Sequence, residues 1–148
     1  MREILFRGKR MNNGEWVEGF LYITHNGEYE IGRYDPYVNI ERITFVVAPD
    51  TVGQFTGLTD KNGKKIFEGD VVKAVIVRDL GGGTEKREET GIIGYGKIGM
   101  IGLIAKYAGT IPVWSDFFQE LTLSGCINDS WFEVIGNIHD NPELLEAD

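Results

Sequence analysis

The stretch that decides the fold runs from Gly53 to Val77 and reads GQFTGLTDKNGKKIFEGDVVKAVIV. Its Asn62-Gly63 pair can adopt the positive φ angles of a tight hairpin turn, and the run DVVKAVIV that follows is rich in β-branched residues. Charged residues and glycines are dense here, as in many functional sites, but the stretch contains no histidine, cysteine or serine. We therefore interpret it as strands joined by turns, a piece of architecture and not a chemical site.

Short runs of alternating or β-branched residues recur along the rest of the chain and predict further strands. They cover residues 3–11, 15–23, 28–34, 41–48, 90–96, 99–107 and 131–138. The pairs Asn13-Gly14 and Asn26-Gly27 predict two more hairpin turns. The segment from Leu80 to Glu89 is rich in glycine and charge, so we expect a mobile loop between two long strands.

Helical patterns are rare in this sequence. The segment SDFFQELTL could form a helix capped by Ser115. Near the end, Asn141 can cap a turn of helix that has Pro142 at its first position. The prediction is a mostly β chain with a short C-terminal helical turn.

The overall composition restricts where the chain can act. A length of 148 residues suits one domain, and Cys126, the only cysteine, cannot form an intramolecular disulfide, which indicates a reducing cytoplasm. No apolar run reaches the length of a signal peptide or a membrane-spanning helix, so we expect no membrane association. The net charge of −8 opposes the neutralisation of phosphates and disfavours nucleic acid as a partner.

Three motifs resemble chemical sites, and each favours a structural role. Residues 94–99 match the phosphate-loop pattern G-x-G-x-x-G, but the residues that follow predict a strand where the loop requires a helix. His25 and His139 lack the local spacing of a zinc site. Glu68 and Asp70 could share one strand face as a carboxylate pair, with little else to support catalysis. We predict no catalytic, metal-binding or cofactor-binding residue, and no enzymatic activity.

Three longer motifs point to a family. The segment FTGLTDKNGKKIFEGDVV (residues 55–72) resembles the signature of the YopX-like family of bacteriophage and prophage proteins, and FEVIGNIHDNPELL (132–145) and FRGKRMNNGEWVEGFLY (6–22) are similar to the close and opening of its members. The family-motif residues, interpreted as structural, are Phe55, Gly57, Leu58, Asp60, Asn62, Gly63, Lys64, Glu68, Gly69, Asp70, Gly136, Asn137, Asn141 and Pro142.

The resemblance implies a single YopX-like domain over residues 1–148. Within it we expect an N-terminal sheet over about residues 1–55, and a small SH3-like β-barrel region over about 56–148 that the C-terminal strand closes. It also implies a bacterial host cell as the setting, and it implies no activity, because the family is known only as uncharacterised phage proteins.

The absence of catalytic clusters favours an accessory protein that binds an unknown host or phage protein. An alternative is association with nucleic acid through Arg7, Lys9 and Arg10 beside Trp16. A small hydrolase at Glu68 and Asp70 is the weakest alternative.

The sequence also raises two questions about the surface. Strand edges with few charges favour a homo-oligomer over a monomer. The acidic balance is most simply a solubility feature. The competing hypothesis is an imitation of DNA charge, carried by Glu85, Glu88 and Glu89 with Asp140, Glu143, Glu146 and Asp148.

Overall fold

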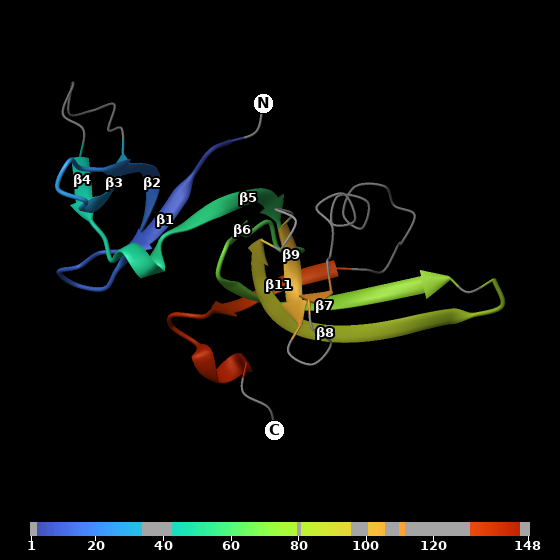
Figure 1. Ribbon diagram of the computed structural model, residues 1–148. Coiled ribbons are helices and arrows are strands. Elements are labelled where there is room, and N and C mark those ends of the chain that lie inside the picture. The colour runs from blue at the N-terminus through green and yellow to red at the C-terminus, as the bar shows by residue number, and fades with distance from the viewer. Residues whose placement is uncertain are drawn as a thin grey trace. The chain divides into compact units, whose positions relative to one another are not determined.

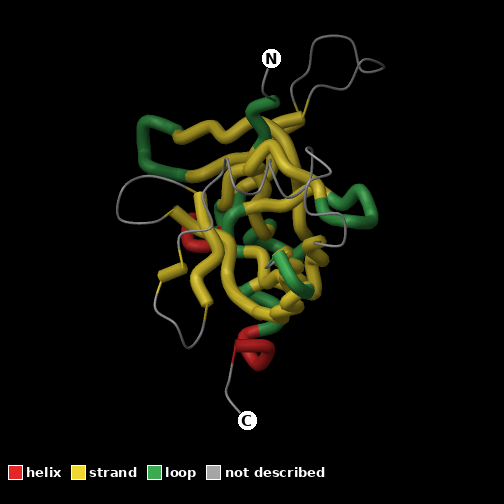
Figure 2. The backbone as a smooth tube through the Cα atoms, turned by 90° about the vertical axis from the view of Figure 1, so that its right-hand side faces the viewer, coloured by secondary structure: helices red, strands yellow, loops and turns green. Residues whose placement is uncertain are grey.

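The structure is a computed structural model, and it describes residues 3–33, 43–79, 81–95, 101–105, 110–111 and 131–145. The chain divides into two compact units, residues 1–57 and 58–148. Strands dominate both units, so the mostly β prediction is confirmed. The helical segments of the described residues are two short 3₁₀ turns, η1 (Pro49–Thr51) and η2 (Pro142–Leu145) (Figure 1, Figure 2).

The first unit is an antiparallel sheet of hairpins. Strand β1 (Phe6–Lys9) pairs with β2 (Trp16–Ile23), β2 with β3 (Tyr29–Arg33), and β3 with β4 (Ile43–Val46). Both predicted turns are confirmed, because Gly14 and Gly27 adopt φ angles of 71° and 82° between the paired strands. Strand β5 (Gly53–Thr59) adds to the other side of β1 through its first residues.

The sheet of the first unit curls until its two ends meet. Arg10 forms an isolated antiparallel bridge with Val47, directly after β1 and β4. The buried side chains of Val17, Ile31 and Val47 form the centre of the core. Five partly buried side chains pack around them: Phe6, Leu21, Tyr29, Phe45 and Val52. One face of each strand is thereby turned to the core, and the other face is turned outward.

The second unit is built on a five-stranded antiparallel sheet. Its strands are β7 (Asp70–Asp79), β8 (Thr84–Tyr95), β9 (Ile101–Ala105), β10 (Thr110–Ile111) and β11 (Trp131–Asn137), in the order β10-β9-β8-β7-β11. A short strand, β6 (Lys65–Phe67), neighbours β5. Among the described strands this sheet is open, with β10 and β11 at its edges. The C-terminal strand β11 extends the sheet, and no barrel is closed within this part of the chain.

The expectation of a mobile loop from Leu80 to Glu89 is wrong for most of that segment. Strand β8 begins at Thr84 and pairs with β7 from Asp79 back to Val71, so the described turn is only Gly81–Gly83, with φ of 77° at Gly81. A high density of charge is poor evidence against a strand. In a hairpin, charged side chains can stay in solvent while the backbone pairs, as the exposed Lys86 and Glu88 do.

Two other sequence features lie partly or wholly outside the described residues. Strand β9 follows the glycine motif and pairs with β8, which confirms a strand in place of the helix that a phosphate loop requires. The predicted helix at SDFFQELTL, with its Ser115 cap, lies outside the described residues.

In the parts of the chain that the structure describes, no helix has both the length and the apolar character needed to cross a lipid bilayer.

Candidate functional site

Strand β2 carries exposed aromatic side chains on the face turned away from the core of the first unit. Successive side chains of a strand point to opposite faces, so Val17 enters the core while Phe20 and Tyr22 lie outside. Phe20 is 63% exposed and Tyr22 is 45% exposed. Two aromatic rings therefore contact solvent at the centre of the sheet.

The neighbouring strands extend this surface. The register places Tyr22 opposite Glu30 and Glu30 opposite Val46. The backbone N–H of Met11 donates to the carbonyl oxygen of Val46 over 2.9 Å, which brings Met11 beside β4. Val46 is 37% exposed and Met11 is 64% exposed. We call Met11, Phe20, Tyr22 and Val46, with Glu30 between them, the outer face.

Two glycines shape the backbone under the outer face. Gly32 lies opposite Phe20 on β3, so the phenyl ring has no cross-strand side chain beside it there. A Cβ atom at Gly19 would overlap the carbonyl oxygen of Gly32, which means that β2 and β3 approach closely because Gly19 has no side chain.

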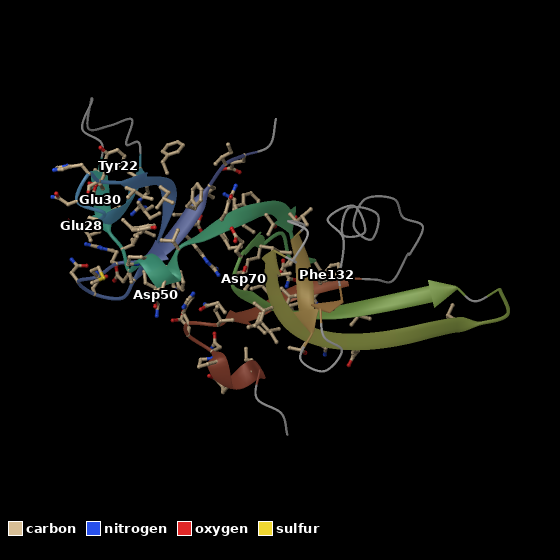
Figure 3. All side chains as sticks on the ribbon, viewed as in Figure 1. Tyr22, Glu28, Glu30, Asp50, Asp70 and Phe132 are labelled. Carbon is tan, nitrogen blue, oxygen red and sulfur yellow. The ribbon has the colours of Figure 1, made fainter. Side chains whose placement is uncertain are left out.

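Carboxylates accompany the apolar side chains of this region. Figure 3 shows Tyr22 and Glu30 on neighbouring strands at one end of the first unit, with Glu28 next to them and Asp50 away from them. Glu18 precedes Phe20 by two residues on the same side of β2 and is exposed. Glu30 thus places a carboxylate among the exposed side chains of the outer face, while Glu18 lies beside it on β2 and opposite Arg7 on β1.

The predicted basic patch divides into two groups. The guanidinium of Arg7 lies 4.7 Å from the centre of the Trp16 ring, and the ammonium of Lys9 lies 5.6 Å from it. Arg10 instead lies 4.3 Å from the ring centre of Phe45 and pairs with Glu15 at 3.7 Å. Cations over aromatic rings are attracted by the ring quadrupole. The structure therefore brings Arg7 and Lys9 together with Trp16, and it separates Arg10 from them.

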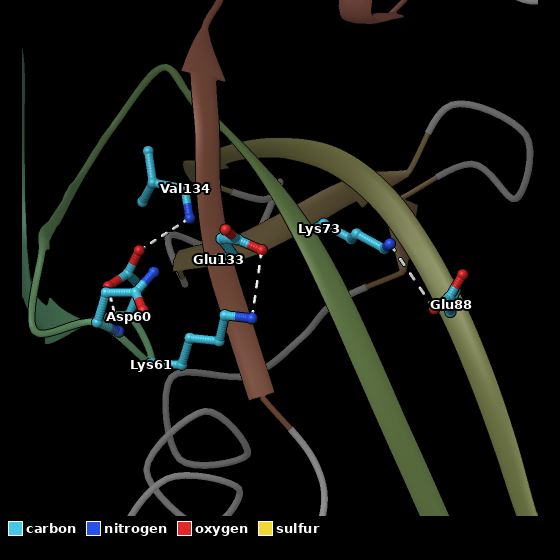
Figure 4. A network of polar contacts seen from close by, with 7 residues as sticks. Asp60, Lys61, Lys73, Glu88, Glu133 and Val134 are labelled. Atoms are coloured by element: carbon cyan, nitrogen blue, oxygen red, sulfur yellow. Dashed lines mark hydrogen bonds and ion pairs between the residues drawn. The ribbon is translucent and has the colours of Figure 1, made fainter.

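The central family motif forms a turn held by Asp60 (Figure 4). Oδ1 of this buried carboxylate accepts the backbone N–H groups of Asn62 at 2.8 Å and Lys64 at 2.9 Å. Oδ2 accepts the N–H of Val134 on β11 at 3.0 Å. Gly63 adopts a φ of 79°, which confirms the third predicted hairpin turn.

The hydrogen bonds determine the charge state of Asp60. Burial is the largest single influence and raises the pKa of Asp60, but the three backbone N–H donors and the nearby charge of Lys64 together outweigh it. The pKa of Asp60 is therefore lowered, and the residue serves as an ionised structural clasp between the turn and β11.

The carboxylate pair considered for hydrolysis is not on one strand face. Glu68 lies in the turn between β6 and β7, where Gly69 adopts a φ of 86°, and only Asp70 begins a strand. Oδ2 of Asp70, which is 1% exposed, accepts the backbone N–H of Phe67 at 2.7 Å. The alternation argument for this pair is therefore wrong, because it assumed a continuous strand.

The C-terminal motif lies beside the start of β7. Asn137 pairs with Asp70 across β11 and β7, and its Oδ1 accepts the N–H groups of His139 and Asp140. Oδ1 of Asn141 accepts the N–H of Asn137 at the end of β11, and its Nδ2 donates to Oε1 of Glu143 in η2, so this side chain joins the strand end to the helical turn. Pro142 begins η2, as predicted.

Most of the family-motif residues lie in the second unit, and Phe55 and Gly57 lie at the end of the first. A Cβ atom at Gly136 would lie 2.5 Å from Oδ1 of Asn141, so glycine is required for this packing. Phe55 is buried, and Gly57, with a φ of 87°, ends the first unit just before Leu58. Among the described residues, no group of three or more His, Cys, Asp or Glu side chains is placed to hold a metal ion.

Sequence reasoning missed the outer face. The run Phe20-Leu21-Tyr22-Ile23 carried a signal, because four consecutive apolar residues cannot all be buried on one side of a strand. One of the two faces therefore had to expose large side chains unless a second layer covered it. The pattern showed this excess, but it did not show which face was covered.

Similarity to known proteins extends over nearly the full length of the chain. The crystal structure of protein EF1440 from Enterococcus faecalis is similar to it at 22% sequence identity, with a TM-score of 0.49, and the similarity covers 99% of this chain and 100% of that chain. No curated protein matches the chain. The family model described as YopX protein matches residues 5–146, a range that contains all three motifs. The chain therefore belongs to the YopX protein family.

Proposed function

We propose that this chain is a phage-derived accessory protein that acts in the cytoplasm of the bacterial host as a non-enzymatic, protein-binding module. The outer face is the observation that carries the proposal. Exposed apolar patches commonly mark protein-binding surfaces, and aromatic and methionine side chains are enriched in such interfaces. The outer face presents one phenylalanine, one tyrosine and one methionine with Val46, all exposed.

The electrostatics of this surface favour a protein over a nucleic acid. Glu18 and Glu30 lie beside the rings that would have to stack on bases, and phosphates are repelled by carboxylates. Arg7 and Lys9 lie over Trp16 and so occupy the ring that the nucleic-acid hypothesis required. These contacts give the basic hairpin a role within the sheet.

The test compares what wild-type and variant proteins capture. Affinity-tagged protein is expressed in phage-infected bacteria, crosslinked and purified, and the bound proteins are quantified by mass spectrometry. The variant Phe20→Ser with Tyr22→Ser removes both rings from the outer face. We expect it to lose the specific partner by more than about tenfold, because exposed aromatic anchors dominate interface energies.

The matched control is Ile4→Ser with Ile135→Ser, which removes two exposed apolar side chains elsewhere. It should capture the partner as the wild type does. Light scattering of the purified protein tests self-association on the same surface, since a monomer has a mass of 16.6 kDa. Equal capture by all three proteins would show that the outer face is not the binding surface.

A further inference from the structure

We propose that the protein partner presents arginine or lysine side chains interspersed with apolar ones to the outer face. The inference rests on the proposed protein-binding function and specifies the chemistry of the partner. It follows from the position of Glu30 within the outer face, from Glu18 two residues before Phe20 on the same side of β2, and from the ion pairs that these two residues lack.

Glu30 lies inside the outer face and not at its rim. On β3 it stands between Tyr22 on β2 and Val46 on β4, in one row across the three strands. Met11 continues this row beyond Val46, through the hydrogen bond between their backbones. Any partner that covers Tyr22 and Val46 must therefore also cover the carboxylate of Glu30.

Glu18 and Glu30 differ from other described acidic residues that form ion pairs. Glu15 pairs with Arg10 at 3.7 Å, and in the second unit Glu133 pairs with Lys61 at 3.4 Å. Within the described part of the chain, neither Glu18 nor Glu30 forms an ion pair. Arg7 stands opposite Glu18 in the register of β1 and β2, whereas Glu30 stands between Tyr22 and Val46. The negative charge of Glu30 is therefore the one that a binding partner must neutralise.

The cost of desolvation decides what that partner must carry. Covering a carboxylate with an apolar surface removes its hydration and leaves a buried charge without a partner. This is strongly unfavourable unless a cation or several hydrogen-bond donors replace the water. A guanidinium or ammonium group on the partner supplies that replacement. The rings of Phe20 and Tyr22, on the same strand side, add a cation–π attraction for the same group.

The acidic residues of the outer-face proposal are not those that the DNA-imitation hypothesis named. Glu88 is engaged with Lys73 at 3.7 Å, and Oδ2 of Asp140 accepts a hydrogen bond from Nδ2 of Asn137. Glu146 and Asp148 lie outside the described residues. The combination of exposed rings with unpaired carboxylates is found on the outer face instead.

The experiment measures binding of defined peptides by fluorescence anisotropy. The probe is a short fluorescein-labelled peptide in which arginine and leucine alternate, and its control has citrulline in place of arginine. A labelled oligothymidine tests for nucleic acid. We expect the arginine peptide to bind about tenfold or more tightly than the citrulline peptide, and to weaken as salt is raised.

Two matched charge variants locate the site. Glu18→Gln with Glu30→Gln keeps the shape of the surface and removes the two carboxylates beside the rings, and should weaken arginine-peptide binding about three- to tenfold. Asp50→Asn with Glu143→Gln makes the same change in net charge at two other exposed positions, and should leave binding unchanged. Equal weakening by both variants would mean attraction to overall charge and would overturn the proposal.

Two further outcomes would overturn the proposal. One is equal binding of the arginine and citrulline peptides, and the other is binding of oligothymidine that competes with the peptide. The failure of this inference is distinguishable from failure of the proposed function. If Glu18→Gln with Glu30→Gln captures the cellular partner as well as the wild type while Phe20→Ser with Tyr22→Ser does not, the face binds a protein of different chemistry.

Discussion

Replacing Asp60 by asparagine tests the clasp that joins the central turn to β11. The asparagine oxygen can still accept the N–H groups of Asn62 and Lys64, but its amide nitrogen then faces the N–H of Val134, and two donors oppose each other. A hydrogen bond to a charged group contributes about 1.5–3 kcal/mol, and a buried donor left without a partner costs about 1–3 kcal/mol. We expect a loss of about 2 kcal/mol in the stability of the second unit.

The assay must report locally, because a chain of two compact units need not unfold in one step. Hydrogen exchange measured by NMR follows the amide of Val134 itself. A loss of 2 kcal/mol predicts an exchange rate about 30-fold faster at this amide in Asp60→Asn. The control Asp50→Asn changes an exposed carboxylate in η1 and should leave that rate unchanged.

The pH dependence provides a second readout with a defined sign. The pKa of Asp60 is lowered in the folded state, so its contribution is complete above the pKa of the unfolded chain, near about 4, and is lost as the pH falls through the folded value. The stability difference between wild type and Asp60→Asn should therefore be constant near neutral pH and narrow in acid. An unchanged exchange rate at Val134, or a difference that widens in acid, would refute the reasoning.

Two further variants test other contacts by urea denaturation. Gly19→Ala should destabilise the first unit by about 3 kcal/mol or prevent its folding, because the new Cβ overlaps the backbone oxygen of Gly32. The control Gly82→Ala adds a methyl group in open space, and its stability should stay within about 0.5 kcal/mol of wild type. Equal losses of stability in the two variants would contradict the close approach of β2 and β3. Lys61→Gln should lower the stability of the second unit by less than about 1 kcal/mol, since the ion pair of Lys61 with Glu133 is partly exposed. A loss of stability as large as that of Asp60→Asn would mean that this ion pair, and not the hydrogen bonds of Asp60, holds the turn.

The part of the fold that was predictable depended on local geometry. Asn13-Gly14, Asn26-Gly27 and Asn62-Gly63 all form turns, because a positive φ is a property of one residue and its neighbours and needs no distant partner. The start of η2 at Pro142 is predictable for the same reason. The charged segment from Thr84 to Glu89 was mispredicted, because its strand exists through pairing with β7.

The sequence by itself determined the strand-rich class, the position of its turns and, through three motifs, membership of the YopX protein family. Only the tertiary structure decided that Asp60 accepts a hydrogen bond from Val134, 74 residues away, and that Phe20 and Tyr22 face outward. The physical reason is the same in both cases. Alternation tells which side chains share a face of a strand, but which face is covered, and which strand lies alongside, depend on burial and pairing summed over segments distant in the chain.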